Sequence, residues 1–245
     1  MSGYKLVWSD EFDYEGLPDP KKWNYNAGGH GWGNNEDQFY VAERPKNCYV
    51  KDGKLKITAQ KEKYENRNYT SGKLTTYNIA SWKYGRFEIK AKLPKGLGTW
   101  PAIWMLPNSI HTGENWPLCG EIDIMEHVGK NENMVHFSLH SELYNHVKNT
   151  QVTYFKQFKD VCSMFHEYAI EWTEEYIEVF VDKITTVKWY KGENNHITSN
   201  EGWPFDKEFY LILNLAIGGN WGGKIDESIF PCSMEVEYVR VYQKI

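Results

Sequence analysis

The sequence of 245 residues contains no apolar run of 18 residues, so it offers no segment that could cross a membrane as a helix. Its first ten residues lack the basic start and apolar stretch of a secretion signal, although a leader already removed is compatible with this. The net charge is −5, and no block of like charge is longer than a few residues. We therefore expect neither nucleic acid nor a membrane surface as a partner.

Cysteine is scarce, and its spacing excludes the common zinc and redox motifs. The four cysteines, Cys48, Cys119, Cys162 and Cys232, are widely scattered and form no paired spacing. They are either buried small hydrophobic residues or members of one or two disulfides. We favour the first, because a domain of this size needs no covalent staples.

Helical periodicity is also missing, and short strand patterns recur instead. In Tyr84–Leu93, apolar and charged residues alternate with a period of two, which predicts a strand with one buried face. Six similar runs, separated by Gly, Pro, Asn and Asp turns, are 53–60, 134–140, 167–172, 176–182, 209–217 and 234–243. With no repeat and no Pro- or Ser-rich linker, the pattern predicts one all-β domain over residues 1–245, a sandwich in which both chain ends dock.

The most informative segment is GEIDIMEHVG at Gly120–Gly129, which places three carboxylates among apolar residues. On a regular strand, Glu121 and Asp123 share one face and Glu126 points to the other. A β-bulge near Met125 would return Glu126 to the first face, and bulges are common beside active sites. The alternative is an edge strand whose charges face water. A calcium loop is disfavoured, because its glycine and polar spacing are absent.

Aromatic residues are abundant, at 16% of the chain, and several lie in glycine-rich, turn-like segments. Such faces suit flat sugar rings. Trp100 and Trp104 are four residues apart on an expected strand and therefore share a face, either in a groove, which we favour, or in the core. Arg86 lies on the polar face of its strand and is interpreted either as a ligand contact in the groove or as half of a solvated pair with Glu88.

These motifs resemble those of family 16 glycoside hydrolases, in particular the laminarinase, or endo-1,3-β-glucanase, branch. The resemblance rests on GEIDIMEHVG preceded by GTWPAIWMLP at Gly98–Pro107. Further segments in the family order are WSDEF at 8–12, GWGNNE at 31–36, YTSGK at 69–73, YGRFE at 84–88 and the closing MEVEYVRVYQ. The resemblance implies a jelly-roll β-sandwich of two curved antiparallel sheets with a concave substrate cleft.

The resemblance also implies roles for individual residues. Glu121 would be the nucleophile of a retaining mechanism, Glu126 the acid/base and Asp123 the helper between them, all without a catalytic cofactor. The substrate contacts implied are Asn34, Arg86, Trp100, Trp104, Trp116 and His140. His136 and His140 share a strand face, and a metal site built on this pair is disfavoured for want of a third ligand.

A structural calcium is implied at Glu11, Gly53 and Glu237, although the family usually has Asp where this chain has Glu237. Lys73 similarly stands in place of the family's usual Arg, which puts a bidentate contact there in question. The resemblance further implies a secreted monomer that acts on β-glucan.

The predicted function is retaining endo-hydrolysis of β-1,3-glucan, with mixed-linkage β-1,3-1,4-glucan as a further substrate. One alternative is a non-catalytic β-glucan-binding module, which the retained acids disfavour because a binder has no use for a desolvated acid trio. The other is a family 16 hydrolase of agar or carrageenan, and the net negative charge argues mildly against sulfated substrates.

Overall fold

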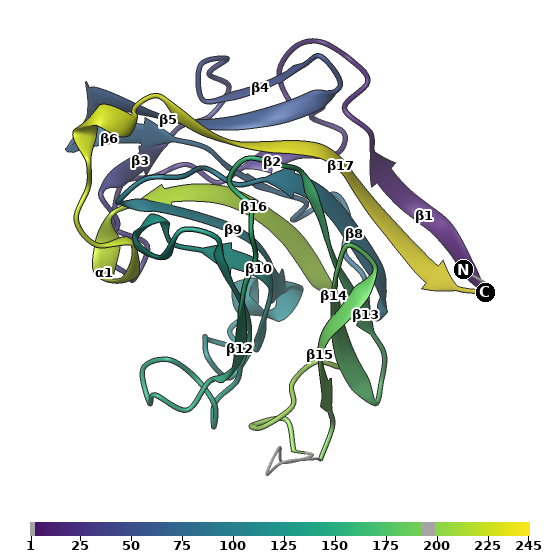
Figure 1. Cartoon of the computed structure of the whole chain (residues 1–245). Helices are drawn as coiled ribbons and strands as arrows, with labels where there is room; N and C mark the ends of the chain where they lie inside the picture. The colour runs from purple at the N-terminus through teal and green to yellow at the C-terminus, as the bar shows by residue number, and fades with distance from the viewer. Residues whose placement is uncertain (1–2, 193–198) are drawn as a thin grey trace.

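The computed structural model describes residues 3–192 and 199–245, which form two curved sheets stacked face to face (Figure 1). In spatial order, the ten-stranded sheet contains β15 (Ile184–Tyr190), β14 (Tyr176–Val181), β13 (His166–Trp172), β8 (Gly85–Lys92), β17 (Cys232–Lys244), β5 (Lys54–Tyr64), β6 (Arg67–Ser71) and β3 (Gln38–Tyr40), with β1 (Tyr4–Asp10) on β17 and β4 (Cys48–Lys51) on β5. The seven-stranded sheet contains β12 (Val152–Gln157), β11 (Met134–His140), β10 (Glu121–His127), β9 (Thr99–Pro107), β16 (Phe209–Ile217), β7 (Lys73–Thr75) and β2 (Asn24–Tyr25).

Helix is confined to single turns in the connections. These are η1 (Asn108–His111), η2 (Gly129–Asn131), α1 (Gly219–Gly222) and η3 (Glu227–Ile229). The all-β sandwich predicted from the sequence is confirmed. The prediction of antiparallel sheets needs one correction, because β3 pairs with β6 in parallel.

The core lies between the two sheets and follows the predicted alternation. On β8, Phe87, Ile89 and Ala91 are fully buried and face the core, as the period-two pattern indicates. Strand β16 is buried at every position, because it lies between β9 and β7 in the seven-stranded sheet, with the core on one face and the cleft lining on the other. This double burial explains its almost continuous apolar sequence.

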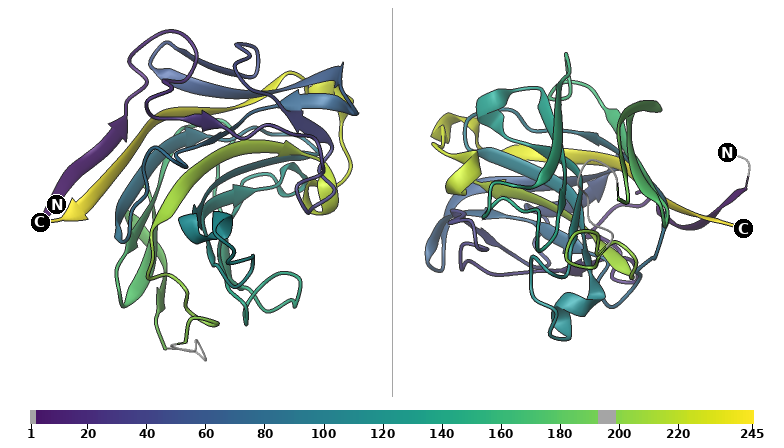
Figure 2. Two further views of the ribbon diagram at one scale, coloured as in Figure 1. Left: turned by 180° about the vertical axis from the view of Figure 1, so that it is seen from behind. Right: turned by 90° about the horizontal axis from the view of Figure 1, so that it is seen from below.

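The smaller sheet curves inside the larger one, so that its free face is concave (Figure 2). The first and last strands run side by side at the outer sheet, with Tyr4 opposite Lys244. The docking predicted for both chain ends is thus confirmed.

All seven strands predicted from alternation are present, as are those expected around Trp100–Trp104 and at the acid cluster. The pattern missed the seven-residue strands β1 and β15 and several shorter ones. Several of these, such as β3 and β7, have only three residues. The edge strand β12 is exposed at five of its six positions, so it lacks the apolar face on which the prediction depends. In the part of the chain that the structure describes, no helix is long and apolar enough to cross a membrane. The four cysteines carry free thiols, of which Cys48 and Cys119 are fully buried.

Candidate active site

A β-bulge in β10 places the acid cluster on the concave face. Against β11, Asp123 pairs with Ser138 and Glu126 with His136, so three steps on β10 match two on its partner. Against β9, the register shifts between Asp123 and Met125. Adjacent residues Ile124 and Met125 both enter the core, which is possible only because the extra residue interrupts the alternation. The predicted bulge is confirmed, and the three acids line one cleft.

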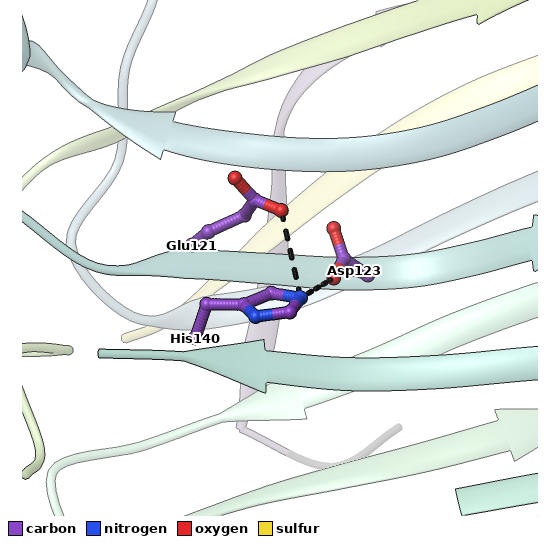
Figure 3. Close-up of side chains that lie close together, drawn as sticks. All are labelled: Glu121, Asp123 and His140. Carbon is purple, nitrogen blue, oxygen red and sulfur yellow. Dashed lines mark ion pairs between the residues drawn. The ribbon is translucent and has the colours of Figure 1, made fainter. Parts of the chain in front are cut away.

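Glu121 and Asp123 project from β10 toward His140, which reaches them from the neighbouring strand β11 (Figure 3). The Nε2 atom of His140 lies 3.1 Å from Asp123 Oδ2 and 3.8 Å from Glu121 Oε1. Both Asp123 and His140 are less than one-tenth exposed. The histidine is therefore the cationic group that balances the two carboxylates when it is protonated.

Burial raises the pKa of each acid. The pKa of Glu121 rises to about 8, first through burial and then through the charge of Asp123. The pKa of Glu126 rises to about 7, through burial and the charge of Glu121, and the pKa of Asp123 is raised in the same way by burial and by Glu126. The cluster therefore retains a proton near neutral pH. Because the pKa of Glu121 is raised at least as far as that of Glu126, these values do not assign the proton to either carboxyl, and the assignment of nucleophile and acid rests on the sequence motif.

Trp100 contacts the acid cluster directly, in addition to lining the cleft. Its Nε1 donates a hydrogen bond to Glu126 Oε1 over 3.1 Å, which lowers the pKa of that carboxyl against the effect of burial. The indole is held in turn by Trp221, whose ring lies edge-on at 5.3 Å and also meets His136 at 4.9 Å. Trp100 thus fixes the orientation of Glu126.

The cleft has a volume of about 590 Å³ and contains most of the predicted substrate contacts. Asn34, Trp100, Trp104 and Trp116 all line it, and His140 lies beneath it against Asp123. The three tryptophans are half-buried, unlike the core tryptophans Trp23, Trp172 and Trp203. Partly exposed indoles in a hollow of this size are suited to stacking on sugar rings.

The placement of Arg86 contradicts its prediction as a cleft residue. Arg86 lies on β8 of the ten-stranded sheet, on the face opposite the core residues Phe87 and Ile89, and therefore on the convex side of the sandwich. Its Nε donates to Glu88 over 2.7 Å, and its guanidinium covers the ring of Phe180. The alternative of a charge pair with Glu88 is correct, although the pair is buried and not solvated.

The sequence did not reveal a buried polar chain that begins beside the acids, at Trp104, the β9 residue opposite Asp123. Trp104 Nε1 donates to Asn214 Oδ1 over 2.7 Å, Asn214 donates to the Tyr40 hydroxyl, and Tyr40 donates to Glu36. Lys73 lies beside this chain, nine-tenths buried. The further cleft residues that were missed are Trp32, Tyr77, His111, His146 and Tyr210. One signal was available, because Asn214 interrupts the apolar run FYLILNLAI.

Lys73 is the cleft's single lysine or arginine among the described residues that line it. Its Nζ lies 4.0 Å from the ring centre of Trp32 and 5.0 Å from that of Trp104. Burial lowers the pKa of this amine to about 8, while Glu36 and Glu121 oppose the shift. A compact ammonium held between two aromatic faces is a single-point hydrogen-bond donor and cannot form a bidentate contact.

The carboxylates at the predicted calcium site lie in ion pairs at the protein surface. Glu11 forms a two-point ion pair with Arg240, and Glu237 pairs with Lys90 Nζ at 2.8 Å. Gly53 lies in the turn between β4 and β5 and offers a backbone carbonyl oxygen. A calcium ion would therefore have to displace Arg240 and Lys90, the calcium site stays a prediction, and no step of the chemistry is assigned to a metal. Among the described residues, the one grouping of metal-ligating side chains is Glu121, Asp123 and His140 in the cleft itself.

Comparisons with known proteins agree with this fold. The chain is 52% identical to a β-glucanase of Rhodothermus marinus, over 98% of this chain and 85% of that protein. The solved laminarinase of Rhodothermus marinus superposes with a TM-score of 0.95 at 50% identity, covering 99% of this chain and 98% of the other. SCLam, a non-specific endo-β-1,3(4)-glucanase, superposes with a TM-score of 0.92 at 45% identity, covering 100% and 93%. The model of glycosyl hydrolases family 16 matches residues 35–240, and the chain belongs to that family.

Proposed function

We propose that this glycoside hydrolase cleaves internal β-1,3 linkages of glucans with retention of configuration. The observation that carries the proposal is the β10 bulge, which turns Glu126 onto the cleft floor beside Glu121 and Asp123. The proposal is supported by the similarity to the laminarinase of Rhodothermus marinus. Mixed-linkage β-1,3-1,4-glucan is a second substrate, in keeping with the likeness to SCLam.

In this mechanism, Glu121 attacks the anomeric carbon while Glu126 donates its proton to the glycosidic oxygen of the leaving sugar. The glycosyl–Glu121 ester is then hydrolysed by water, whose proton returns to Glu126. Such a double displacement needs the two carboxyls about 5–5.5 Å apart. Asp123, which is itself held by His140, hydrogen-bonds with Glu121, and Trp100 donates to Glu126, so that each carboxyl has a partner that orients it.

The cleft chemistry favours a neutral glucan over a sulfated galactan. Its described lining includes four acids, Glu36, Glu121, Asp123 and Glu126, against one lysine, Lys73, and two histidines, His111 and His146. A sulfated chain would meet net repulsion there. The cleft equally disfavours a pure binding module, because three buried acids with raised pKa values are costly and add nothing to sugar affinity.

A substrate panel and product stereochemistry test the proposal. We expect release of reducing ends from laminarin, weaker release from lichenan, and none from agarose or carrageenan. Proton NMR at the start of laminarin hydrolysis should show the β-anomer first, because two inversions restore the original configuration. Appearance of the α-anomer first, or inertness toward laminarin, would contradict the assignment.

We further propose that the protein acts outside the cell and is a monomer. Size-exclusion chromatography tests the oligomeric state.

A further inference from the structure

A second hollow lies at the end of the ten-stranded sheet where both chain ends meet (Figure 1). Its volume is about 630 Å³, and none of its lining residues belongs to the cleft. The lining comes from four segments far apart in sequence: Tyr4, Lys83–Gly85, Trp172–Tyr176 and Gln243–Lys244. We refer to it as the end hollow.

The walls of the end hollow carry tyrosine rings that are fixed in place. Tyr84 lies edge-on against the buried ring of Trp172 at 5.4 Å. Tyr176 donates its hydroxyl proton to Glu171 and packs beside Tyr190 with 5.8 Å between ring centres. Half-buried rings that are already ordered lose little conformational entropy when a ligand stacks on them.

The charge around the end hollow selects the class of ligand. Lys83, Lys244, Glu174 and Glu175 all line it, and all four are exposed. The two positive and two negative side chains have no net charge together, so they attract neither an anionic nor a cationic ligand. They do supply donors and acceptors in equal number, which together with aromatic walls is the chemistry that recognises a neutral sugar.

Another minor hollow provides a contrast. It has a volume of about 380 Å³ and lies beside Cys162 and Cys232. No aromatic residue lines it. Of these two hollows, the end hollow therefore has the features of a carbohydrate site.

We propose that the end hollow is a second β-glucan-binding site, which holds a distant stretch of polymer while the cleft cleaves. This inference rests on the proposed function for its ligand. A long or particulate glucan held in the cleft also offers a distant stretch to the end hollow, which raises its effective concentration at the cleft, whereas a short oligosaccharide in the cleft offers no such stretch. The end hollow should therefore matter for polymer and not for short substrates.

The test compares Tyr176→Ala and Tyr4→Ala with the unmodified protein on particulate β-1,3-glucan and on a soluble β-1,3-linked pentasaccharide. We expect the rate on the particulate substrate to fall about fivefold in each variant, the effect of losing one ring contact, while the rate on the pentasaccharide stays unchanged. Tyr154→Ala is the matched control, because Tyr154 is an exposed tyrosine on β12 that lines neither site. It should alter neither rate.

A binding measurement separates retention from catalysis. In a Glu121→Gln background, which leaves the polymer intact, co-sedimentation with particulate glucan should fall in the Tyr4→Ala and Tyr176→Ala variants and not in Tyr154→Ala. If the ratio of the rate on particulate glucan to the rate on the pentasaccharide is unchanged in both variants, the proposal of a second binding site is refuted. If the unmodified protein releases no sugar from either substrate, it is the proposed function that fails.

Discussion

The concave and convex faces of the molecule use similar residue types for opposite purposes. On the convex face of the ten-stranded sheet, several carboxylates have cationic partners, as in Arg86–Glu88 at 2.7 Å and Lys188–Glu178 at 3.0 Å, whereas Glu167 and Glu171 accept hydrogen bonds from tyrosine hydroxyls. On the concave face, no lysine or arginine pairs with Glu121, Asp123 or Glu126 within 4.0 Å in the described chain. Within that distance, Glu121 and Asp123 instead meet the imidazole of His140.

The pKa values follow from this difference. At the convex edge, Arg240 holds the pKa of Glu11 below its usual range through a two-point hydrogen bond. In the cleft, burial without a permanent cation raises the pKa of Glu121 and Glu126. Paired carboxylates stabilise a fold, whereas unpaired buried carboxylates destabilise it and are retained where chemistry needs a proton.

The strongest test of this difference between the two faces is to neutralise Glu126 or Glu121 in the cleft. Glu126→Gln should lower kcat/KM on laminarin by about 10²–10⁴-fold, because general acid catalysis is lost, and Glu121→Gln should abolish turnover because no ester can form. Both substitutions remove a costly buried charge, so neither should lower the melting temperature at pH 8. Undiminished turnover in either variant would refute the role of that carboxyl.

The next largest effect is expected at Asp123. Asp123→Asn removes the charge that raises the pKa of Glu121, so the acidic limb of the pH–rate profile should move to lower pH. The rate at the optimum should fall less than in the Glu121 variant, by about 10–100-fold, because His140 loses its carboxylate partner at 3.1 Å. A loss equal to that of Glu121→Gln, without movement of the acidic limb, would show that Asp123 does more than tune and position its neighbours.

A smaller effect should follow from Trp100→Phe, which keeps an aromatic ring but removes the donor to Glu126. Because that hydrogen bond stabilises the ionised carboxylate, its loss should raise the pKa of Glu126 and move the alkaline limb of kcat/KM to higher pH. We expect kcat to fall about tenfold through poorer orientation of the acid. A fall in affinity with an unmoved pH profile would mean that Trp100 serves only as a sugar platform.

The sequence predicted the acid trio and the bulge because both are local. Glu121, Asp123 and Glu126 lie within six residues, and a single bulge is enough to bring them to one face. Strand β8 shows the limit of the method. Its alternation identified a polar face correctly, but polar residues cover both the convex surface and the cleft, so the pattern could not assign Arg86 to either.

The polar chain from Glu36 through Tyr40 to Asn214 was beyond the sequence for a different reason. Tyr40 and Asn214 are 174 residues apart in sequence. They meet because Tyr40, at the end of β3, lies beside Asn214 on β16 of the seven-stranded sheet. No spacing rule connects residues at such a separation. Lys73 is likewise a cleft residue only because the three-residue strand β7 pairs with β16.

A substitution of Arg86 should have the smallest effect on activity, and it tests most directly whether the convex face serves stability and not catalysis. Arg86→Met should leave kcat/KM on laminarin unchanged, because the residue lies on the convex side, away from the cleft. The same substitution leaves the buried Glu88 carboxylate without its cationic partner and should lower the free energy of unfolding by about 3–5 kcal/mol. Chemical denaturation would measure this loss, and the double variant Arg86→Met/Glu88→Leu should recover much of it, since an apolar pair removes the unpaired charge. A specific fall in kcat/KM for a folded Arg86→Met protein would show that the convex and concave faces are not as separate in function as their charge pairing indicates.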